Sequence, residues 1–214
     1  MNVRRLDMET PLGVVHMVAF PKGGEGAPSH REIIFEILSE YTGRNVTAEN
    51  LKLSHGLLDS SAENVQKPAT DVSSREATRP TFSCLDFDVN WTHSGNDCVV
   101  AFGERGSLVN GVGLHLGVDM EVHKPKRLRV AERFYSPEEN LHLETLDESR
   151  RLQEFYRLWC RKEAFFKCAG GSFFEGAVGR NVLDNPLSVG PFQVFFVDVP
   201  WEEGTSLCLA VCKD

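Results

Sequence analysis

The amino-acid sequence predicts an α+β fold in which small antiparallel sheets are packed with helices in two halves. Three observations predict it. Strand-like segments with alternating apolar residues occur in both halves, and so do helix-starting signals. Strands and helices also lack the regular βαβ alternation of a doubly wound fold. This order favours small antiparallel sheets over one large parallel sheet.

The first half begins with a predicted strand and a predicted helix. Residues 12–20 are rich in valine, which favours a strand. Ser29 and Glu32 have the spacing of a capping box, with Ser29 as the N-cap. An apolar stripe at helical spacing follows, and Gly43 is a typical stop signal. We therefore expect a helix over residues 30–42.

The stretch 56–79 has a different composition. It is rich in Ser, Ala, Thr and charged residues and has no apolar period, so we expect a long surface loop. Phe87, Val89 and Trp91 then alternate with polar residues, which predicts a half-buried strand. A turn at 92–95 joins it to a second predicted strand at 98–102. This interpretation places His93 at the bend of a hairpin.

The second half has the same kinds of signal. Apolar residues alternate through 114–122, which predicts a strand. Ser136 followed by Pro137 predicts the start of a helix. Thr145 and Glu148 have capping-box spacing and predict a longer helix that extends to about Cys168. Residues 192–199 and 207–211 are expected to be the closing strands.

The composition argues against several classes of protein. The formal net charge is −8, which argues against general nucleic-acid binding because phosphate neutralisation needs a basic surface. No apolar run is long enough to span a bilayer, and the first residues lack the pattern of a secretory leader. The six cysteines form no CxxC pair, so we expect reduced, mostly buried thiols in a cytoplasmic protein.

Basic residues gather between Lys124 and Arg133, in a stretch that includes Lys126 and Arg127. Two interpretations stay open for this stretch. It is either a solvated loop and helix face, or a docking surface for an acidic partner or a phosphate-rich ligand.

Two acids share one face of the predicted strand 114–122. Because side chains alternate along a strand, Asp119 and Glu121 point away from its apolar set. Two carboxylates two residues apart repel each other if they are partly buried. Either they face solvent at an edge, or they bind a hard cation such as Mg²⁺, which takes carboxylate oxygens together with phosphates.

A third acid lies on the long predicted helix. At about 100° per residue, Glu163 falls on the apolar stripe of this helix, one turn after Trp159. Lys162 flanks it and Lys167 follows one turn later. Charged groups on a face that should be buried are costly unless they are paired or bind a ligand. The alternatives are an intrahelical Glu163–Lys167 pair and a ligand site.

Together with His93, these residues indicate magnesium-dependent phosphate chemistry. Acids can hold a metal ion, the ion can hold a diphosphate, and lysine and histidine can neutralise the remaining phosphate oxygens. The sequence contains no GxxxxGK loop, no GxGxxG after a strand, no HExxH and no GxSxG. The residues alone do not identify the substrate.

The same segments resemble the Sfp-type 4'-phosphopantetheinyl transferases. The family's G-[IV]-D-x-E strand matches residues 117–121, and its W-x-x-K-E-[AS]-x-x-K helix matches residues 159–167. A strand ending in Ser/Thr-His-Ser-Gly matches residues 92–95, and the family's arginine-phenylalanine segment matches residues 131–139. Where the family usually has Gly-Lys-Pro, this chain has Thr78-Arg79-Pro80, and arginine keeps the charge of lysine but not its geometry.

The resemblance implies two similar halves, residues 1–112 and 113–214, arranged as an intrachain pseudo-dimer with coenzyme A between them. It implies Mg²⁺-dependent transfer of the 4'-phosphopantetheine group of coenzyme A to a serine of an acyl or peptidyl carrier protein. Adenosine 3',5'-bisphosphate would be released. It also implies a monomer, and the basic stretch suits an acidic carrier protein.

Roles for individual residues follow from the same resemblance. Asp119, Glu121 and Glu163 would hold Mg²⁺ on the diphosphate, and Glu163 or a water on the metal ion would be the base. The implied ligand-binding residues are His93, Arg79, Lys162, Lys167 and Arg31. Of these, His93 would contact the diphosphate and the two lysines would bind phosphate oxygens.

Two alternatives to the transferase remain. One is a relative that binds coenzyme A or a carrier protein without transfer, although the intact acid set argues against it. The other is a magnesium-dependent phosphohydrolase, which the same acids would serve but which the family motifs disfavour.

Overall fold

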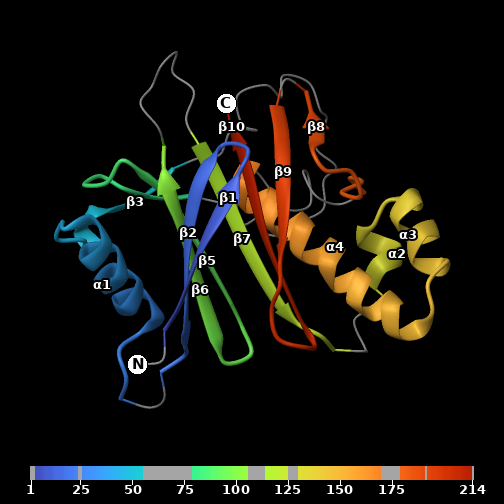
Figure 1. Ribbon diagram of the computed structural model, residues 1–214, viewed down its shortest axis with the longest axis horizontal. Coiled ribbons are helices and arrows are strands. Elements are labelled where there is room, and N and C mark those ends of the chain that lie inside the picture. The colour runs from blue at the N-terminus through green and yellow to red at the C-terminus, as the bar shows by residue number, and fades with distance from the viewer. Residues whose placement is uncertain are drawn as a thin grey trace, which may run out of the picture.

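The computed structural model describes residues 3–23, 26–54, 79–105, 114–124, 130–169, 179–190 and 192–213. It shows an α+β protein with two four-stranded antiparallel sheets and one two-stranded sheet among these residues. The two large sheets lie in the middle of the molecule, with helix α1 on one side and helix α4 on the other (Figure 1). This arrangement confirms the predicted fold class.

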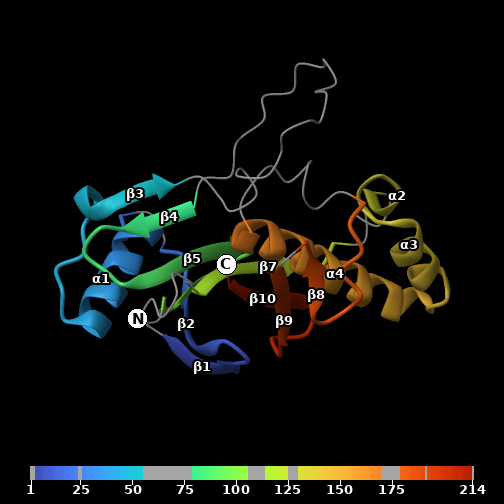
Figure 2. The same cartoon turned by 90° about the horizontal axis from the view of Figure 1, so that it is seen from above.

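The first large sheet has the strand order β1-β2-β6-β5. Its strands are β1 (Arg4–Thr10), β2 (Gly13–Pro21), β5 (Phe87–Ser94) and β6 (Asp97–Glu104). Helix α1 (His30–Thr42) packs on it, followed by the 3-10 helix η1 (Ala48–Asn50) and the strand pair β3 (Leu51–Ser54) and β4 (Arg79–Phe82). This pair lies beside α1 (Figure 2), where Phe82 contacts Phe35 with ring centroids 5.8 Å apart.

The second large sheet has the order β7-β10-β9-β8. Its strands are β7 (Leu114–Val122), β8 (Leu187–Val189), β9 (Phe192–Val199) and β10 (Thr205–Lys213). The helices of this part are α2 (Ala131–Phe134), α3 (Pro137–Glu144) and α4 (Glu148–Ala169).

Alternation along the strands divides the core into layers. In β2, Met17 packs in the cluster between the two sheets, whereas Val18 packs against α1. In β10, Leu209 packs between the sheets and Ala210 packs beneath α4. The layers therefore run α1, first sheet, second sheet, α4, and both sheets bury apolar side chains on two faces.

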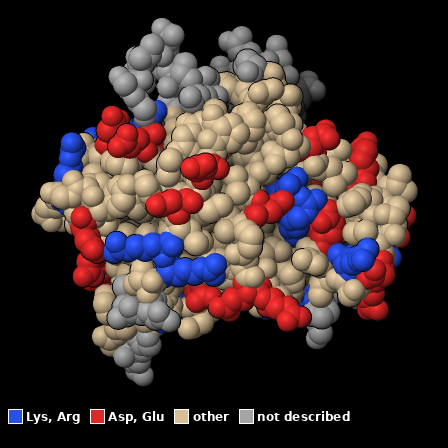
Figure 3. Space-filling view, viewed as in Figure 1, with Lys and Arg blue, Asp and Glu red and all other residues tan. Residues whose placement is uncertain are grey.

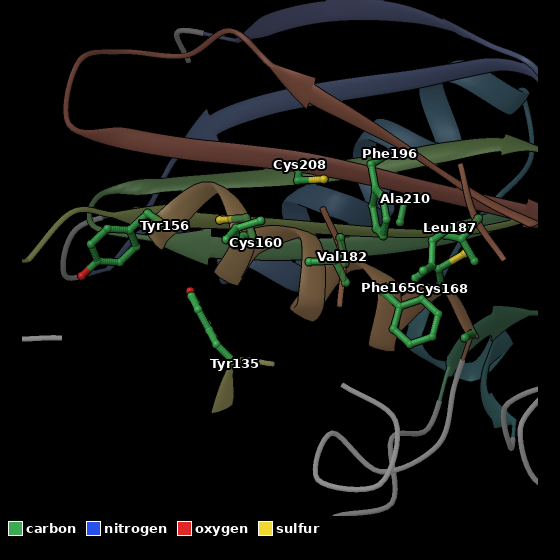
Figure 4. Close-up of a cluster of buried hydrophobic side chains, with 14 of the residues drawn as sticks. Tyr135, Tyr156, Cys160, Phe165, Cys168, Val182, Leu187, Phe196, Cys208 and Ala210 are labelled. Carbon is green, nitrogen blue, oxygen red and sulfur yellow. The ribbon is translucent and has the colours of Figure 1, made fainter. Parts of the chain in front are cut away.

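The cluster beneath α4 fixes that helix on the second sheet. Tyr156, Cys160 and Phe165 of α4 pack with Phe196 of β9 and Ala210 of β10 (Figure 4). All three α4 side chains have no exposed surface. Burial of aromatic side chains on this scale holds a helix firmly in place, so side chains on the flanks of α4 have defined positions.

The helix ends confirm two of the predicted starts. Ser29 Oγ accepts the N–H of Glu32, and the Ser29 N–H donates to Glu32 Oε2 at 2.6 Å, which completes the capping box of α1. Gly43 ends this helix in the left-handed region at φ 66°. Ser136 and Glu139 form the same capping box at α3.

The start of α4 differs from the predicted one. Thr145 is the C-cap that directly follows α3, and its hydroxyl donates to His142 O at 2.7 Å, so the predicted Thr145–Glu148 cap is wrong. Asp147 precedes the first residue of α4, and its Oδ1 accepts the N–H of Arg150 at 3.0 Å. The helix itself, Glu148–Ala169, agrees with the predicted span.

Two strand predictions also need correction. β5 continues to Ser94 and pairs His93 with Cys98, so His93 lies within the strand and the turn follows at Gly95, which has φ 58°. The edge strand β1 was not predicted, because its apolar alternation is limited to Leu6 and Met8 among charged, largely exposed residues.

Some predictions fall on residues that the structure does not describe. The first-sheet strands end at Glu104 and the second-sheet strands begin at Leu114, while the predicted boundary at 112/113 lies between them. The predicted surface loop 56–79 lies outside the described residues except for Arg79. The division into halves stays a prediction.

The cysteines match the expected reduced state. All six are free thiols, and five of them are buried. Burial raises the pKa of Cys160 and Cys208 well above the ordinary thiol value, which keeps these thiols protonated and unreactive.

Candidate functional site

Strand β7 turns two acids toward α4. Val118 and Met120 pack in the cluster between the sheets, so Asp119 and Glu121 project from the opposite face of the strand, as predicted. Asp119 is 6% exposed, whereas Glu121 is half-buried. A carboxylate as buried as Asp119 needs partners, because an isolated charge is costly away from water.

Gly117 allows α4 to lie directly against β7. A Cβ atom at this position would lie 2.2 Å from Ala164 O and 2.5 Å from Cys168 N. Both are backbone atoms of the helix, so any larger residue would push α4 away from the strand. The glycine of the G-V-D-M-E segment therefore brings the end of α4 to the acids of β7.

This close approach places Lys167 next to Asp119. Its Nζ donates to Asp119 Oδ1 at 2.7 Å and to Val118 O at 2.9 Å. Thr92 Oγ1 donates to the same Asp119 oxygen at 3.2 Å. Asp119 Oδ2, by contrast, is buried and accepts no hydrogen bond from the described residues. A buried carboxylate oxygen without a donor indicates a position suited to a cation.

Cationic and imidazole groups gather around His93. Its ring stacks on His30 with centroids 5.8 Å apart. His93 is exposed overall, but partial burial of its ring lowers its pKa, the positive charges of Lys22, His30 and Lys167 lower it further, and Asp119 acts in the opposite direction. Lys22 Nζ also donates to Gly95 O at 3.2 Å, in the turn that follows His93.

The sequence analysis missed Lys22, His30 and Thr92. A local signal existed for His30 alone, since it follows the N-cap of α1 and helix N-termini favour anions. Lys22 and Thr92 join the site only because β2, β5 and β7 come together in space.

Of the two predicted arginines, the structure describes the side chain of Arg31 but not that of Arg79. Arg31 is exposed on the first turn of α1, next to His30. Arg79 begins β4, where its backbone pairs with Ser54, and its side chain lies outside the described residues. Their predicted contacts with a nucleotide stay predictions.

Lys162 lies in the interior rather than at the acids of β7. Its Nζ lies 2.7 Å from Glu139 Oε2, and neither side chain has any exposed surface. The ammonium also donates to Arg180 O and faces the Tyr135 ring at 5.3 Å. The predicted contact with phosphate oxygens does not fit this placement, because the ammonium is already enclosed by protein groups.

Glu139 is the other half of this buried pair. Its carboxylate accepts hydrogen bonds from the N–H groups of Ser136 and Val182, and it forms an ion pair with Lys162. The pair therefore joins α3, α4 and the segment before β8. Sequence reasoning assigned Glu139 to a helix cap alone and missed this second role.

The three predicted metal ligands come from two elements, with Asp119 and Glu121 on β7 and Glu163 on α4. Glu163 is half-buried on α4, one turn before Lys167. Across the described ranges, no three His, Cys, Asp or Glu side chains lie close enough together to hold a metal ion. The donors nevertheless fit Mg²⁺ in kind, since all three are carboxylates and Asp119 Oδ2 is a buried oxygen with no hydrogen-bond donor among the described residues.

The surface has mixed charge. On the face in Figure 3, basic and acidic side chains lie in small neighbouring groups, and its described part shows no extended basic surface. The described residues also contain no helix that is long and apolar enough to cross a membrane. Lys126 and Arg127 of the predicted docking stretch lie outside the described residues.

Comparison with known proteins gives one consistent family. The family model described as the 4'-phosphopantetheinyl transferase superfamily matches residues 115–209, which include α4 and all of β7 after Leu114. A Synechocystis sp. protein provisionally named a 4'-phosphopantetheinyl transferase is 35% identical over 101 residues, which are 46% of this chain and 37% of that protein.

Two further relatives have the same kind of name. The 4'-phosphopantetheinyl transferase AcpT of Salmonella typhi is 28% identical over 148 residues, 68% of each chain. The 4'-phosphopantetheinyl transferase Sfp of Bacillus subtilis is 33% identical over 99 residues, 46% of this chain and 40% of that protein. The alignments thus span less than half of the Synechocystis and Bacillus proteins.

Proposed function

We propose that this chain, a member of the 4'-phosphopantetheinyl transferase superfamily, transfers the 4'-phosphopantetheine group of coenzyme A to a serine of an acyl or peptidyl carrier protein. The observation that supports it most is the Asp119–Lys167 pair beside His93. An acid with one unpartnered oxygen, next to several cationic groups, suits a diphosphate with its metal ion.

Asp119, Glu121 and Glu163 are the residues that would hold Mg²⁺. When bound, the ion would supply positive charge to the diphosphate as the phosphoryl bond breaks. Lys167 holds Asp119 from one side, so the other carboxylate oxygen keeps a fixed direction. Lys167 also places a positive charge beside the acid, where an anionic ligand benefits from it.

The groups around His93 would bind the anionic part of coenzyme A. His93, His30 and Lys22 come from β5, α1 and the end of β2, so their common location depends on the fold. A neutral imidazole still offers one N–H donor to a phosphate oxygen. Arg31, one residue after His30, is placed for a more distant phosphate, and Arg79 stays a proposed nucleotide contact.

The chemistry is a displacement at phosphorus. The serine oxygen of the carrier forms a bond to the β-phosphorus, and the bond from that phosphorus to the bridging oxygen breaks. Adenosine 3',5'-bisphosphate leaves with the bridging oxygen. We expect Glu163 to accept the serine proton, with water as the alternative acceptor.

Lys162 has a structural role in this proposal. The buried pair with Glu139 orients α4, on which Glu163 and Lys167 lie.

The proposal also covers the oligomeric state, which we take to be a monomer because both sheets already bury both faces within one chain. We also include the cytoplasm, since free buried thiols suit a reducing compartment, and an acidic carrier protein as the partner.

Intact-mass measurement of an apo acyl carrier protein tests the proposal. The carrier is incubated with this protein, coenzyme A and MgCl₂, beside a Glu163→Gln variant and a sample with chelator. We expect the carrier to gain one phosphopantetheine with the wild-type protein and neither control to modify it.

Other outcomes would point to the alternatives. Binding of coenzyme A without modification of any of several carriers would favour a binding-only relative. Release of inorganic phosphate from a nucleotide without carrier modification would favour a phosphohydrolase.

A further inference from the structure

Strand β7 is joined to the first sheet by side chains instead of a backbone ladder. One edge of β7 pairs with β10. On the other edge, four β7 N–H groups donate to polar side chains of β5. These bonds join Leu116 to Asp88 at 2.8 Å, Val118 to Asn90 at 3.1 Å, Met120 to Thr92 at 3.4 Å and Val122 to Ser94 at 3.0 Å.

The rungs of this side-chain ladder follow a constant spacing. Donor and acceptor residues are 28 positions apart in every rung, so β5 and β7 run in step in the same direction. Buried backbone N–H groups must be satisfied, and every second side chain of β5 does this for every second residue of β7. The ladder therefore fixes the register of the acid strand against the first sheet.

The last two rungs also contact the acids. Thr92 Oγ1 accepts from Met120 and donates to Asp119 Oδ1 at 3.2 Å. Ser94 Oγ accepts from Val122 and donates to Glu121 Oε2 at 3.4 Å. A hydroxyl can perform both tasks at once, because it has one proton to donate and lone pairs to accept with.

We propose that Thr92 and Ser94 are positioning residues that orient the Asp119 and Glu121 carboxylates for a divalent cation. The inference rests on the proposed function. Thr92 and Lys167 together occupy Asp119 Oδ1, which leaves the buried Oδ2 for the ion. Groups that hydrogen-bond to metal ligands fix their direction, and their loss typically weakens metal affinity about 10- to 100-fold.

Three kinds of variant separate this role from simple support of the fold. Thr92→Val and Ser94→Ala each remove a ladder rung together with its contact to an acid. Thr92→Ser keeps the hydroxyl. Asn90→Ala removes a rung that accepts the Val118 N–H, and among the described residues Asn90 forms no hydrogen bond with either acid, so this variant is the matched control for loss of a rung alone.

The assay measures Mn²⁺ binding in the presence of coenzyme A. The electron paramagnetic resonance signal of the free ion is the readout. Urea unfolding of each variant is recorded alongside. We expect Thr92→Val and Ser94→Ala to raise the Mn²⁺ dissociation constant about 10- to 100-fold. Thr92→Ser and Asn90→Ala should stay within about threefold of the wild-type protein, even where unfolding shows lost stability.

Equal Mn²⁺ affinity in wild type, Thr92→Val and Ser94→Ala would overturn the inference, and so would an equal loss in Asn90→Ala. If Thr92→Val does not fold, Ser94→Ala decides, since Ser94 lies at the half-buried end of the ladder. Wild-type protein that modifies the carrier while the variants bind Mn²⁺ normally would refute the positioning role and leave the proposed function intact. Wild-type protein that neither binds Mn²⁺ nor modifies the carrier would refute both.

Discussion

Replacing Lys162 with methionine tests whether this lysine supports the fold or binds a ligand. The Lys162–Glu139 pair has no exposed surface on either side chain and an N–O distance of 2.7 Å. Burial lowers the pKa of Lys162 and Glu139 acts in the opposite direction, so the carboxylate is what keeps the ammonium charged inside the protein. Lys162→Met leaves the Glu139 carboxylate buried without its counter-charge. Removing one partner of a buried pair costs about 3–5 kcal/mol.

That loss is large enough to measure by urea or thermal unfolding. At roughly 2–4 °C per kcal/mol for a chain of this size, Lys162→Met should lower Tm by roughly 6–20 °C. The double variant Lys162→Met/Glu139→Gln removes both charges, so its loss should be smaller than the sum of the single losses by at least about 1 kcal/mol. Arg5→Met is the control, because the Arg5–Glu40 pair is exposed and its loss should have no measurable effect.

A different result would refute the reasoning. If Lys162→Met unfolds within about 1 kcal/mol of the wild-type protein yet no longer binds coenzyme A by calorimetry, then Lys162 faces the ligand. The buried Lys162–Glu139 pair would in that case be absent from the protein that binds coenzyme A.

Three further predictions follow. Gly117→Ala should lower the free energy of unfolding in urea by about 3 kcal/mol, because the new Cβ would lie 2.2 Å from a backbone oxygen of α4. Unchanged stability would show that α4 can move away from β7. Burial acts to raise the pKa of Glu154, but the hydrogen bonds and charge of Arg157 outweigh it and hold the pKa below the ordinary value of 4.5. The stability from this acid should therefore be complete above pH 4.5 and be lost as the pH falls through the folded pKa, and Glu154→Gln should flatten that part of the stability–pH curve. Lys126→Glu/Arg127→Glu should weaken carrier binding more than coenzyme A binding in calorimetry, and an equal loss of both would argue against docking there.

Local sequence patterns were sufficient for several elements. The capping boxes at Ser29 and Ser136 predicted the starts of α1 and α3, because the bonds that satisfy a helix end join residues only three positions apart. The alternation in residues 114–122 likewise placed Asp119 and Glu121 on the face opposite the core, since this property depends on the strand period alone.

Other features could not be predicted because competing local signals were equally plausible. Thr145 and Asp147 both precede α4, and the one that caps it depends on where α3 ends. His93 was expected at a bend, but pairing with β6 extends β5 past it. Strand β1 has a charged, exposed composition and exists because β2 offers it an edge.

The sequence by itself determined the α+β class, the two acids on one strand face and the lysine–glutamate helix that accompanies them. The tertiary structure alone decided what these groups contact. Lys167 reaches Asp119 because Gly117 admits α4, whereas Lys162, on the same helix, turns into the interior to meet Glu139. Such partners come from segments far apart along the chain, so no local period or motif spacing contains information about them.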